Sequence, residues 1–301
     1  MKVDSKLAKA IKSGDFILTA EYLPVAGTDS SVIEPAASSL GGSVLAVNVA
    51  DNHFGVAMSS LAASVAMLKA GVEPVYQIVT RDRNRIALQS DLLGAEYLGI
   101  KNVLCLSGYH QTLTGSPESA NVYDIDSIQL VAAVRKMRDQ GVLRDGTKIK
   151  GEFSMLIGAV ANPYLTPLEL NIIRLNKKTE AGADFIQTQA VFDIEALGRW
   201  LEAAVSEGIT EKTAILAGIM PLESAAEAEK LRETYTDMYI SDELIERLKA
   251  AGGEDAQKKE GLAVCAETIK KVKDMNGVRG IHILSGGKEA TVSGLLAASG
   301  L

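Results

Sequence analysis

Apolar residues gather in eight short, β-branched runs, and amphipathic stretches separate most of these runs. Each run is apolar almost throughout, which is typical of strands that are covered on both faces. The predicted strands are residues 16–22, 44–49, 74–79, 102–106, 154–159, 185–188, 213–218 and 280–284. The predicted helices between them are residues 59–70, 84–98, 127–140, 167–181, 194–207 and 224–234.

Eight strands with helical crossovers predict a (β/α)8 TIM barrel of the α/β class, formed by residues 1–301 as a single domain. Glycines 71, 99, 141 and 182 follow the helical patterns, where helices commonly end. The long interval before the last strand holds two more helical patterns, 240–251 and 258–273, so we expect extra helices there. The alternative is an open doubly wound sheet, but no glycine-rich phosphate loop follows the first strand.

Composition is that of an ordinary soluble globular protein, with 47% hydrophobic and 23% charged residues. The net charge of −7 and the lack of a basic run argue against a nucleic-acid partner. Cys105 and Cys265 are far apart, and the start of the chain lacks a secretory apolar core. With no apolar stretch long enough to span a membrane, we expect a cytoplasmic protein.

Polar residues follow the predicted strands, and Glu21 is the most informative of them. It closes the apolar run that Pro24 stops, so its carboxyl group is expected at the tip of a buried strand. A buried carboxylate needs a partner, a proton or a chemical task. Buried amides likewise need partners, which makes Gln77, Gln187 and Gln189 candidates for ligand contacts.

Other polar residues allow a plainer interpretation. Asp51 and His53 fit ordinary loop polarity as well as they fit a site. The histidines at 53, 110 and 282 have no acidic or cysteine companion at ligand spacing, so no metal site is predicted. Cys105 lies inside a predicted strand, where an inert buried thiol is expected.

Several motifs, in this order along the chain, resemble the methylenetetrahydrofolate reductase family over essentially all 301 residues. The sequences of these motifs are most similar to those of the family branch that is common in acetogenic and related anaerobic bacteria. The motifs are Ala20-Glu-Tyr-Leu-Pro24, Val47-Asn-Val-Ala-Asp-Asn52, Glu73-Pro-Val-Tyr-Gln-Ile-Val-Thr-Arg-Asp-Arg-Asn-Arg85, Ser90-Asp-Leu-Leu-Gly94, Asn102-Val-Leu-Cys-Leu-Ser-Gly108, Lys177-Lys-Thr-Glu-Ala-Gly-Ala-Asp-Phe-Ile-Gln-Thr-Gln189, Gly218-Ile-Met-Pro221 and Gly277-Val-Arg-Gly-Ile-His282.

The resemblance implies a flavin-dependent enzyme that reduces 5,10-methylenetetrahydrofolate to 5-methyltetrahydrofolate. The flavin is FAD or FMN, and the sequence does not choose between them. Glu21 matches the family's general acid, which protonates the leaving nitrogen so that hydride can add. Its expected burial offers desolvation as the physical route to a raised pKa.

The resemblance also assigns the ligand contacts. Gln189 matches the glutamine that holds the pterin, and Met220 and Lys288 are the other expected substrate contacts. Lys178 is expected to bring a cation to the flavin phosphate. The expected flavin contacts are Asn52, Gln77, Arg81, Leu106, Ser107, Gly108, Tyr109, Tyr123, Asp124, Asn162, Lys178 and Gln187.

Two departures from the family pattern bear on mechanism. Tyr109 replaces an aspartate beside the flavin, which should ease flavin reduction, weaken folate binding and leave Glu21 as the only acid at the reacting centre. The pKa of Glu21 should then rest on burial more than on a neighbouring charge. After Gly218-Ile-Met-Pro221, many members that use pyridine nucleotides carry an aromatic that stacks on the nicotinamide cofactor and folate, whereas the segment Leu222-Glu-Ser-Ala225 here holds none. Electrons are therefore expected from an iron-sulfur- and zinc-bearing partner subunit, within an oligomer or hetero-complex.

Two alternatives stay open. One is a conventional NAD(P)H-dependent methylenetetrahydrofolate reductase that supports methionine synthesis. The other is a barrel that binds flavin or folate without catalysis and serves as a scaffold or electron-transfer subunit. Tyr109 is consistent with this alternative, because it replaces the family's aspartate beside the flavin.

Overall fold

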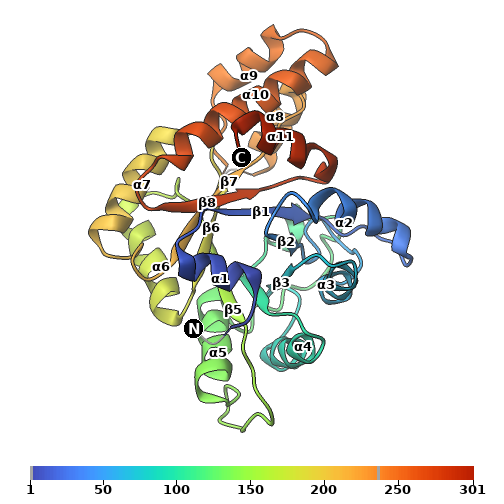
Figure 1. Ribbon diagram of the computed structural model, residues 1–301, viewed down its shortest axis with the longest axis vertical. Helices are drawn as coiled ribbons and strands as arrows, with labels where there is room; N and C mark the ends of the chain where they lie inside the picture. Colours follow the sequence, from blue (N-terminus) through green and yellow to red (C-terminus); the bar gives the residue numbers. More distant parts are fainter. Residues whose placement is uncertain (1–2, 236–237) are drawn as a thin grey trace.

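Eight parallel strands form a closed barrel in the computed structural model, which describes residues 3–235 and 238–301 (Figure 1). The ring closes where β1 pairs with β8, with Ile17 opposite Gly280. The prediction of a (β/α)8 barrel is confirmed. The strands are β1 (Ile17–Tyr22), β2 (Ala46–Val49), β3 (Pro74–Val79), β4 (Asn102–Leu106), β5 (Leu156–Ala161), β6 (Phe185–Ala190), β7 (Ala214–Ile219) and β8 (Val278–Ile283).

The predicted helices are present, with bounds that differ by a few residues. They are α3 (Ser60–Lys69), α4 (Arg85–Tyr97), α5 (Ser127–Gln140), α6 (Leu168–Ala181), α7 (Ile194–Ser206), α8 (Ala225–Thr234), α9 (Asp242–Ala250) and α10 (Glu254–Lys273). Asp126 caps α5 in a capping box with Gln129, and Gly141 ends it in the left-handed conformation.

Three short α-helices were not predicted: α1 (Lys6–Ser13), α2 (Glu34–Leu40) and α11 (Val292–Ser299). Helices of this length depend on packing rather than on their own propensity, so the sequence signals them weakly. Three single-turn 3-10 helices were also missed: η1 (Ser30–Val32), η2 (Gln111–Leu113) and η3 (Glu289–Thr291).

Strand β5 begins two residues later than predicted. Ser154, the expected first residue, is tied to α4 instead, because its backbone N–H donates to the Glu96 carboxylate at 3.0 Å. The strand starts at Leu156, whose N–H donates to the carbonyl oxygen of Lys101 at 2.8 Å. Asn162 therefore lies directly after β5, at the mouth of the barrel.

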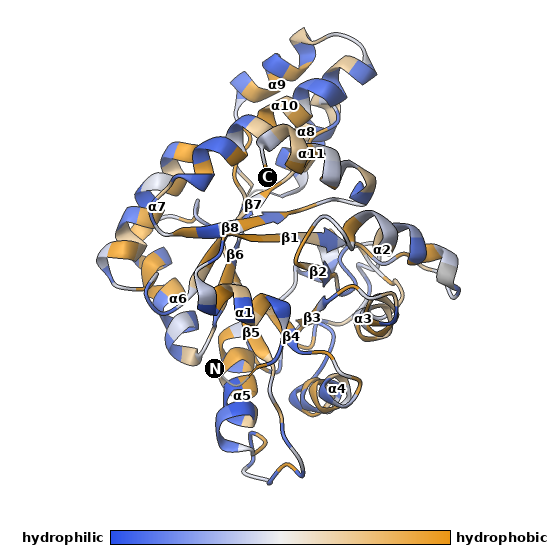
Figure 2. Cartoon of the chain, in the orientation of Figure 1, coloured by the Kyte–Doolittle hydropathy of each residue, from blue (hydrophilic) through white to orange (hydrophobic). Residues whose placement is uncertain are grey.

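The lower half of the barrel interior is filled by apolar side chains and closed by α1. Leu7 of α1 packs with a layer that includes Ile17, Leu104 and Phe185. A Cβ atom at position 158 would lie 2.2 Å from the Phe185 ring, so Gly158 is needed for this packing. Figure 2 shows strands that are mostly hydrophobic inside helices striped with both kinds of residue.

Between β7 and β8 the chain forms α8, α9 and α10, which gather at one end of the molecule (Figure 1). The expected extra helices before the last strand are thus confirmed. We call residues 222–235 and 238–273, which hold these three helices, the helical cap. Within it, α8 and α9 share an apolar cluster that includes Leu248 and the flanking residues Leu222 and Tyr235, and Tyr109 and Met220 of the barrel mouth pack against this cluster.

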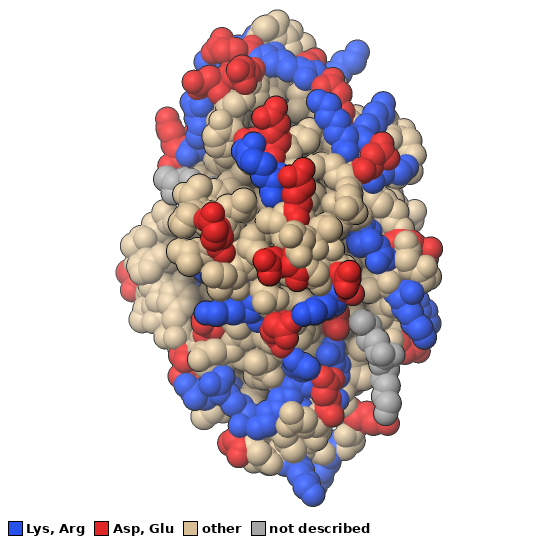
Figure 3. Space-filling view, turned by 90° about the vertical axis from the view of Figure 1, so that its left-hand side faces the viewer, with Lys and Arg blue, Asp and Glu red and all other residues tan. Residues whose placement is uncertain are grey.

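On the face over α6 and α7, acidic and basic side chains are interspersed (Figure 3). Such a mixture produces no strong one-sign field of the kind that attracts a phosphate backbone. Among the helices in the described part of the chain, none is both long and apolar enough to cross a membrane.

Candidate active site at the barrel mouth

Glu21 lies at the end of β1 with only 6% of its surface exposed. Burial is the main cause that raises the pKa of its carboxyl group, to about 7, and the negative charge of Glu289 raises it further. A hydrogen bond from Gln77 of β3 acts in the opposite direction and lowers this pKa. A carboxyl group poised near neutrality can hold a proton and give it up at physiological pH.

Glu289 corrects the expectation that Glu21 is the only acid at this centre. It belongs to η3, which follows β8. The hydroxyl of Ser285 joins the two acids, donating to the backbone oxygen of Glu21 at 2.8 Å and lying 3.3 Å from Oε1 of Glu289. Burial still precedes the Glu289 charge among the causes of the raised pKa, so the predicted order of effects is confirmed.

Gln189 extends from β6 beside a local irregularity of the sheet. The β6–β7 register shifts between Gln187 and Ala190, and Thr188 accepts a hydrogen bond from the Gly218 N–H at 2.9 Å. A Cβ atom at position 218 would lie 2.4 Å from the Thr188 carbonyl oxygen, so only glycine fits there. Such bulges redirect side chains near active sites.

Tyr109 meets Gln189 at the mouth. The Gln189 amide nitrogen Nε2 donates to the Tyr109 hydroxyl at 2.9 Å. The Tyr109 ring lies 5.0 Å from the Tyr235 ring of the helical cap, at an interplanar angle of 44°. The cap therefore reaches the predicted pterin-holding glutamine through a pair of tyrosines.

Arg81 ties three mouth loops together. Its guanidinium is 2% exposed and pairs with Asp82 at 2.8 Å. It also donates to the carbonyl oxygens of Asn52 at 2.9 Å and Tyr109 at 3.2 Å. These contacts occupy the Arg81 guanidinium. Arg81 therefore fixes the backbone at Asn52 and Tyr109, two of the expected flavin contacts.

The Ser107–Gly108 turn follows Leu106 at the end of β4. Gly108 has a φ of 82°, and a Cβ atom there would lie 3.2 Å from Cβ of Arg81, so the turn requires glycine. The Tyr123 hydroxyl donates to the Gly108 carbonyl oxygen at 3.1 Å. Ser107 accepts from the Arg81 backbone N–H at 3.0 Å.

Gln187 lies below the mouth, in a polar layer that closes on itself. Its amide exchanges hydrogen bonds with Asn48 at 2.7 and 3.1 Å and lies 3.4 Å from the Thr19 hydroxyl. That hydroxyl lies 2.9 Å from Nδ1 of His282, whose pKa burial lowers to about 3. The structure therefore does not bring Gln187 to the mouth with the other expected flavin contacts.

The sequence carries a signal for this layer. Thr19 and Gln187 each precede a mouth residue by two positions, and side chains two apart in a strand share a face. Asn48 likewise lies one residue before the end of β2 at Val49.

Two further predicted contacts lie on α6 and directly after β5. Lys178 donates its ammonium N–H to the Val160 carbonyl oxygen, and burial, followed by the Arg174 charge, lowers its pKa to about 8. Asn162 is 9% exposed and accepts from the Tyr164 N–H at 2.9 Å.

Three other predicted contacts are held by protein groups. The hydrogen bonds from Arg85 hold the pKa of Asp124 down to about 2. Lys288 pairs with Glu227 at 2.6 Å. The Met220 carbonyl oxygen accepts from the Cys265 thiol at 3.2 Å. At these three positions, a ligand would have to meet side chains or backbone that already have partners.

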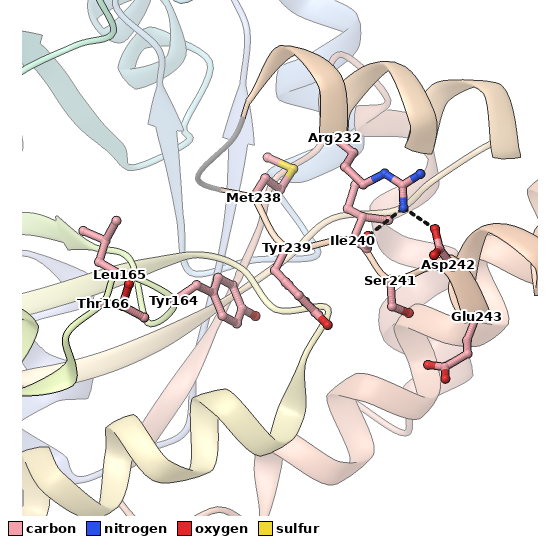
Figure 4. A pocket seen from close by; sticks show the side chains of 10 residues that line it. All are labelled: Tyr164, Leu165, Thr166, Arg232, Met238, Tyr239, Ile240, Ser241, Asp242 and Glu243. Carbon is pink, nitrogen blue, oxygen red and sulfur yellow. Dashed lines mark hydrogen bonds and ion pairs between the residues drawn. The ribbon is translucent and has the colours of Figure 1, made fainter.

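Two cavities lie beside the mouth. One, of about 840 Å³, lies between the segment 164–166 and the segment 238–243, and Arg232 pairs there with Asp242 (Figure 4). The other, of about 510 Å³, is bounded by segments 23–26 and 53–57 and contains His53. Burial, with the Arg81 charge, lowers the pKa of His53 to about 4, so its imidazole is neutral.

Together these features define a parallel α/β barrel whose mouth carries a protonatable glutamate, a redirected glutamine and a glycine turn. The profile of the family described as "Methylenetetrahydrofolate reductase" matches residues 6–300. The chain belongs to the methylenetetrahydrofolate reductase family.

Individual relatives are distant. A probable methylenetetrahydrofolate reductase (NADPH) of Caenorhabditis elegans is 25% identical over 248 residues, which are 81% of this chain and 34% of that protein. The 5,10-methylenetetrahydrofolate reductase of Escherichia coli is 24% identical over 186 residues, 61% of this chain and 55% of that protein. The chain thus spans less than two thirds of the length of these curated relatives.

Among solved structures, an uncharacterised protein from Clostridium thermocellum that binds two copies of 5-methyl-5,6,7,8-tetrahydrofolic acid has a TM-score of 0.67. It is 12% identical, and the alignment covers 98% of this chain and 99% of that one. A 2,3-dimethylmalate lyase is similar at a TM-score of 0.52 and 14% identity. At these identities the likeness supports the barrel fold alone.

Proposed function

We propose that this chain reduces 5,10-methylenetetrahydrofolate to 5-methyltetrahydrofolate with the help of a bound flavin, in the cytoplasm. The observation that carries the proposal is Glu21, a buried carboxyl group with a pKa of about 7 at the mouth of a barrel of this family. Membership of the family supports the choice of substrate.

Glu21 supplies the proton. The methylene bridge joins two folate nitrogens, and one carbon–nitrogen bond must break before the carbon can accept hydride. A protonated Glu21 transfers its proton to the leaving nitrogen, so this nitrogen departs neutral and the carboxylate remains. Gln77 donates to Glu21 and stabilises that carboxylate, while Glu289 favours its return to the acid.

The residues at the mouth fit a flavin. In the turn at 107–108, Gly108 offers backbone without a side chain, at a φ of 82° that favours glycine and with Cβ of Arg81 only 3.2 Å from where its own Cβ would lie. Lys178 offers a half-buried ammonium group whose lowered pKa shows the cost of its burial, and a phosphate would offset that cost. Asn162 and Tyr123 would contribute polar contacts. When bound and reduced, the flavin supplies the hydride.

The proposal also includes the electron donor, an iron-sulfur partner subunit. The segment 222–225, where many relatives carry a stacking aromatic, holds none, and Leu222 and Ala225 are buried in the helical cap. This segment offers a nicotinamide no ring on which to stack, which supports an iron-sulfur partner subunit as donor. Steady-state assays with NADH, NADPH and a reduced viologen test this. Ordinary turnover of the isolated chain with either nucleotide would contradict the proposed donor and support the conventional NAD(P)H-dependent reaction.

The experiment for the function itself is Glu21→Gln. Because the amide keeps the size of the side chain but cannot donate a catalytic proton, reduction of methylenetetrahydrofolate should slow by about 10²- to 10⁴-fold. The matched control is Glu34→Gln, an exposed carboxylate of α2, which should react like the wild type. If Glu21→Gln turned over normally, Glu21 would not be the acid.

A further inference from the structure

Tyr109 contacts three separate parts of the mouth. Its hydroxyl accepts from Gln189 of β6, its ring packs beside Tyr235 of the helical cap, and its carbonyl oxygen accepts from Arg81. Its ring also lies 6.4 Å from the ring of His53, at 86°. A residue held from so many sides has a fixed position, so its hydroxyl is a fixed point for whatever bonds to it.

We propose that Tyr109 is a positioning residue that holds the Gln189 amide in the orientation that receives the pterin ring. The inference rests on the proposed function, and it assigns a task to the residue that departs from the family's aspartate. Tyr109 need not touch the substrate to do this.

The physical reason is the freedom of a glutamine side chain. Gln189 has three rotatable bonds, and ordering a long polar side chain when a ligand binds costs conformational entropy. A hydrogen bond to a fixed hydroxyl orders the side chain before the ligand arrives. An amide also carries an acceptor oxygen and a second N–H, so one bond to Tyr109 leaves groups for a ring edge.

The surrounding contacts make Tyr109 stiff enough for this task. Arg81, 2% exposed, binds the Tyr109 backbone and is itself fixed by Asp82. The ring is packed between neutral partners, because the lowered pKa of His53 keeps that imidazole uncharged. Removal of the hydroxyl alone should therefore leave the ring in place.

The test is Tyr109→Phe in protein purified with its bound cofactor, with 5-methyltetrahydrofolate binding measured by calorimetry. Loss of one hydrogen bond that orders Gln189 should weaken binding by about five- to tenfold. In a Gln189→Leu background, Tyr109→Phe should have no further effect, because the residue through which it acts is gone. Tyr97→Phe, on a ring that is 90% exposed at the end of α4, is the control and should bind normally.

Unchanged or tighter binding by Tyr109→Phe would overturn the inference, and so would effects that add in the double variant. Tighter binding would mean that the hydroxyl competes with the pterin for Gln189. If the wild-type protein failed to bind 5-methyltetrahydrofolate, the proposed function would fall, and the inference with it. Binding by the wild type that Tyr109→Phe leaves unchanged removes the inference alone.

Discussion

The tips of β1 and β2 each carry a buried carboxyl group, and the two are held in opposite ways. Asp51, just after β2, is 2% exposed, and it accepts from the Arg83 guanidinium at 2.6 Å and from the Val79 N–H at 2.9 Å. Glu21, at the end of β1, is 6% exposed, and the charge that bears on it is another carboxylate, Glu289. A guanidinium pairs with one acid, whereas burial and a second carboxylate raise the pKa of the other.

The difference teaches that burial alone does not mark a catalytic acid. A buried carboxylate that pairs with a guanidinium has a structural role. A buried carboxyl group beside amides and another acid keeps its proton and can deliver it.

The largest effect on stability is expected from Asp51→Asn. Removal of one partner from a buried ion pair leaves the Arg83 charge poorly compensated, although Asp91 still contacts it at 3.0 Å. We expect the free energy of unfolding to fall by about 3 kcal/mol, measured by urea denaturation. Glu180→Gln, in an exposed pair with Lys212, is the control and should leave the free energy of unfolding nearly unchanged. A loss no greater than that of the control would remove the structural role of Asp51.

Glu21→Gln should change how stability depends on pH. The pKa of Glu21 rises from its ordinary 4.5 to about 7, so the folded state binds this proton more tightly than the unfolded state. The stability that this proton contributes is present below pH 4.5 and is lost as the pH rises through 7. Relative to Glu21→Gln, the wild type should lose about 3 kcal/mol between pH 4 and pH 8. Parallel stability curves for the two proteins would contradict the raised pKa.

The sequence predicted the barrel and Glu21 because both depend on local patterns. Continuous apolar runs define strands, and a carboxylate that ends one of them is conspicuous. The same reasoning left Asp51 undecided, because its partner Arg83 lies 32 residues on and only the β2–β3 pairing brings them together.

Other parts of the site depended on tertiary contacts. The sequence did not predict that Glu289 lies close enough to act on Glu21. The 3-10 helix η3 folds back toward β1, and no hydrophobic periodicity indicates this contact. Gln187 was assigned to the ligand, yet its partner is Asn48, from across the barrel. The lack of an aromatic in segment 222–225 was predicted, but the burial of Leu222 and Ala225 in the helical cap required the structure.

A smaller effect should follow Glu289→Gln. The second cause of the raised pKa of Glu21 is the charge of Glu289, so removing that charge should lower this pKa. The fall of kcat with rising pH should then move to lower pH by about one unit or less, because burial remains. Glu34→Gln should leave the profile unmoved. A profile that stays in place or moves to higher pH in Glu289→Gln would show that Glu289 does not act on Glu21.

The most direct measurement is the titration of the Glu21 carboxyl group itself. Protein labelled with ¹³C at glutamate side-chain carboxyls would be followed by NMR as a function of pH, with Glu21→Gln used to assign the signal. A midpoint near pH 7 is predicted. A midpoint at or below 4.5, the ordinary value for glutamate, would contradict the assignment of Glu21 as a buried acid that carries its proton at neutral pH.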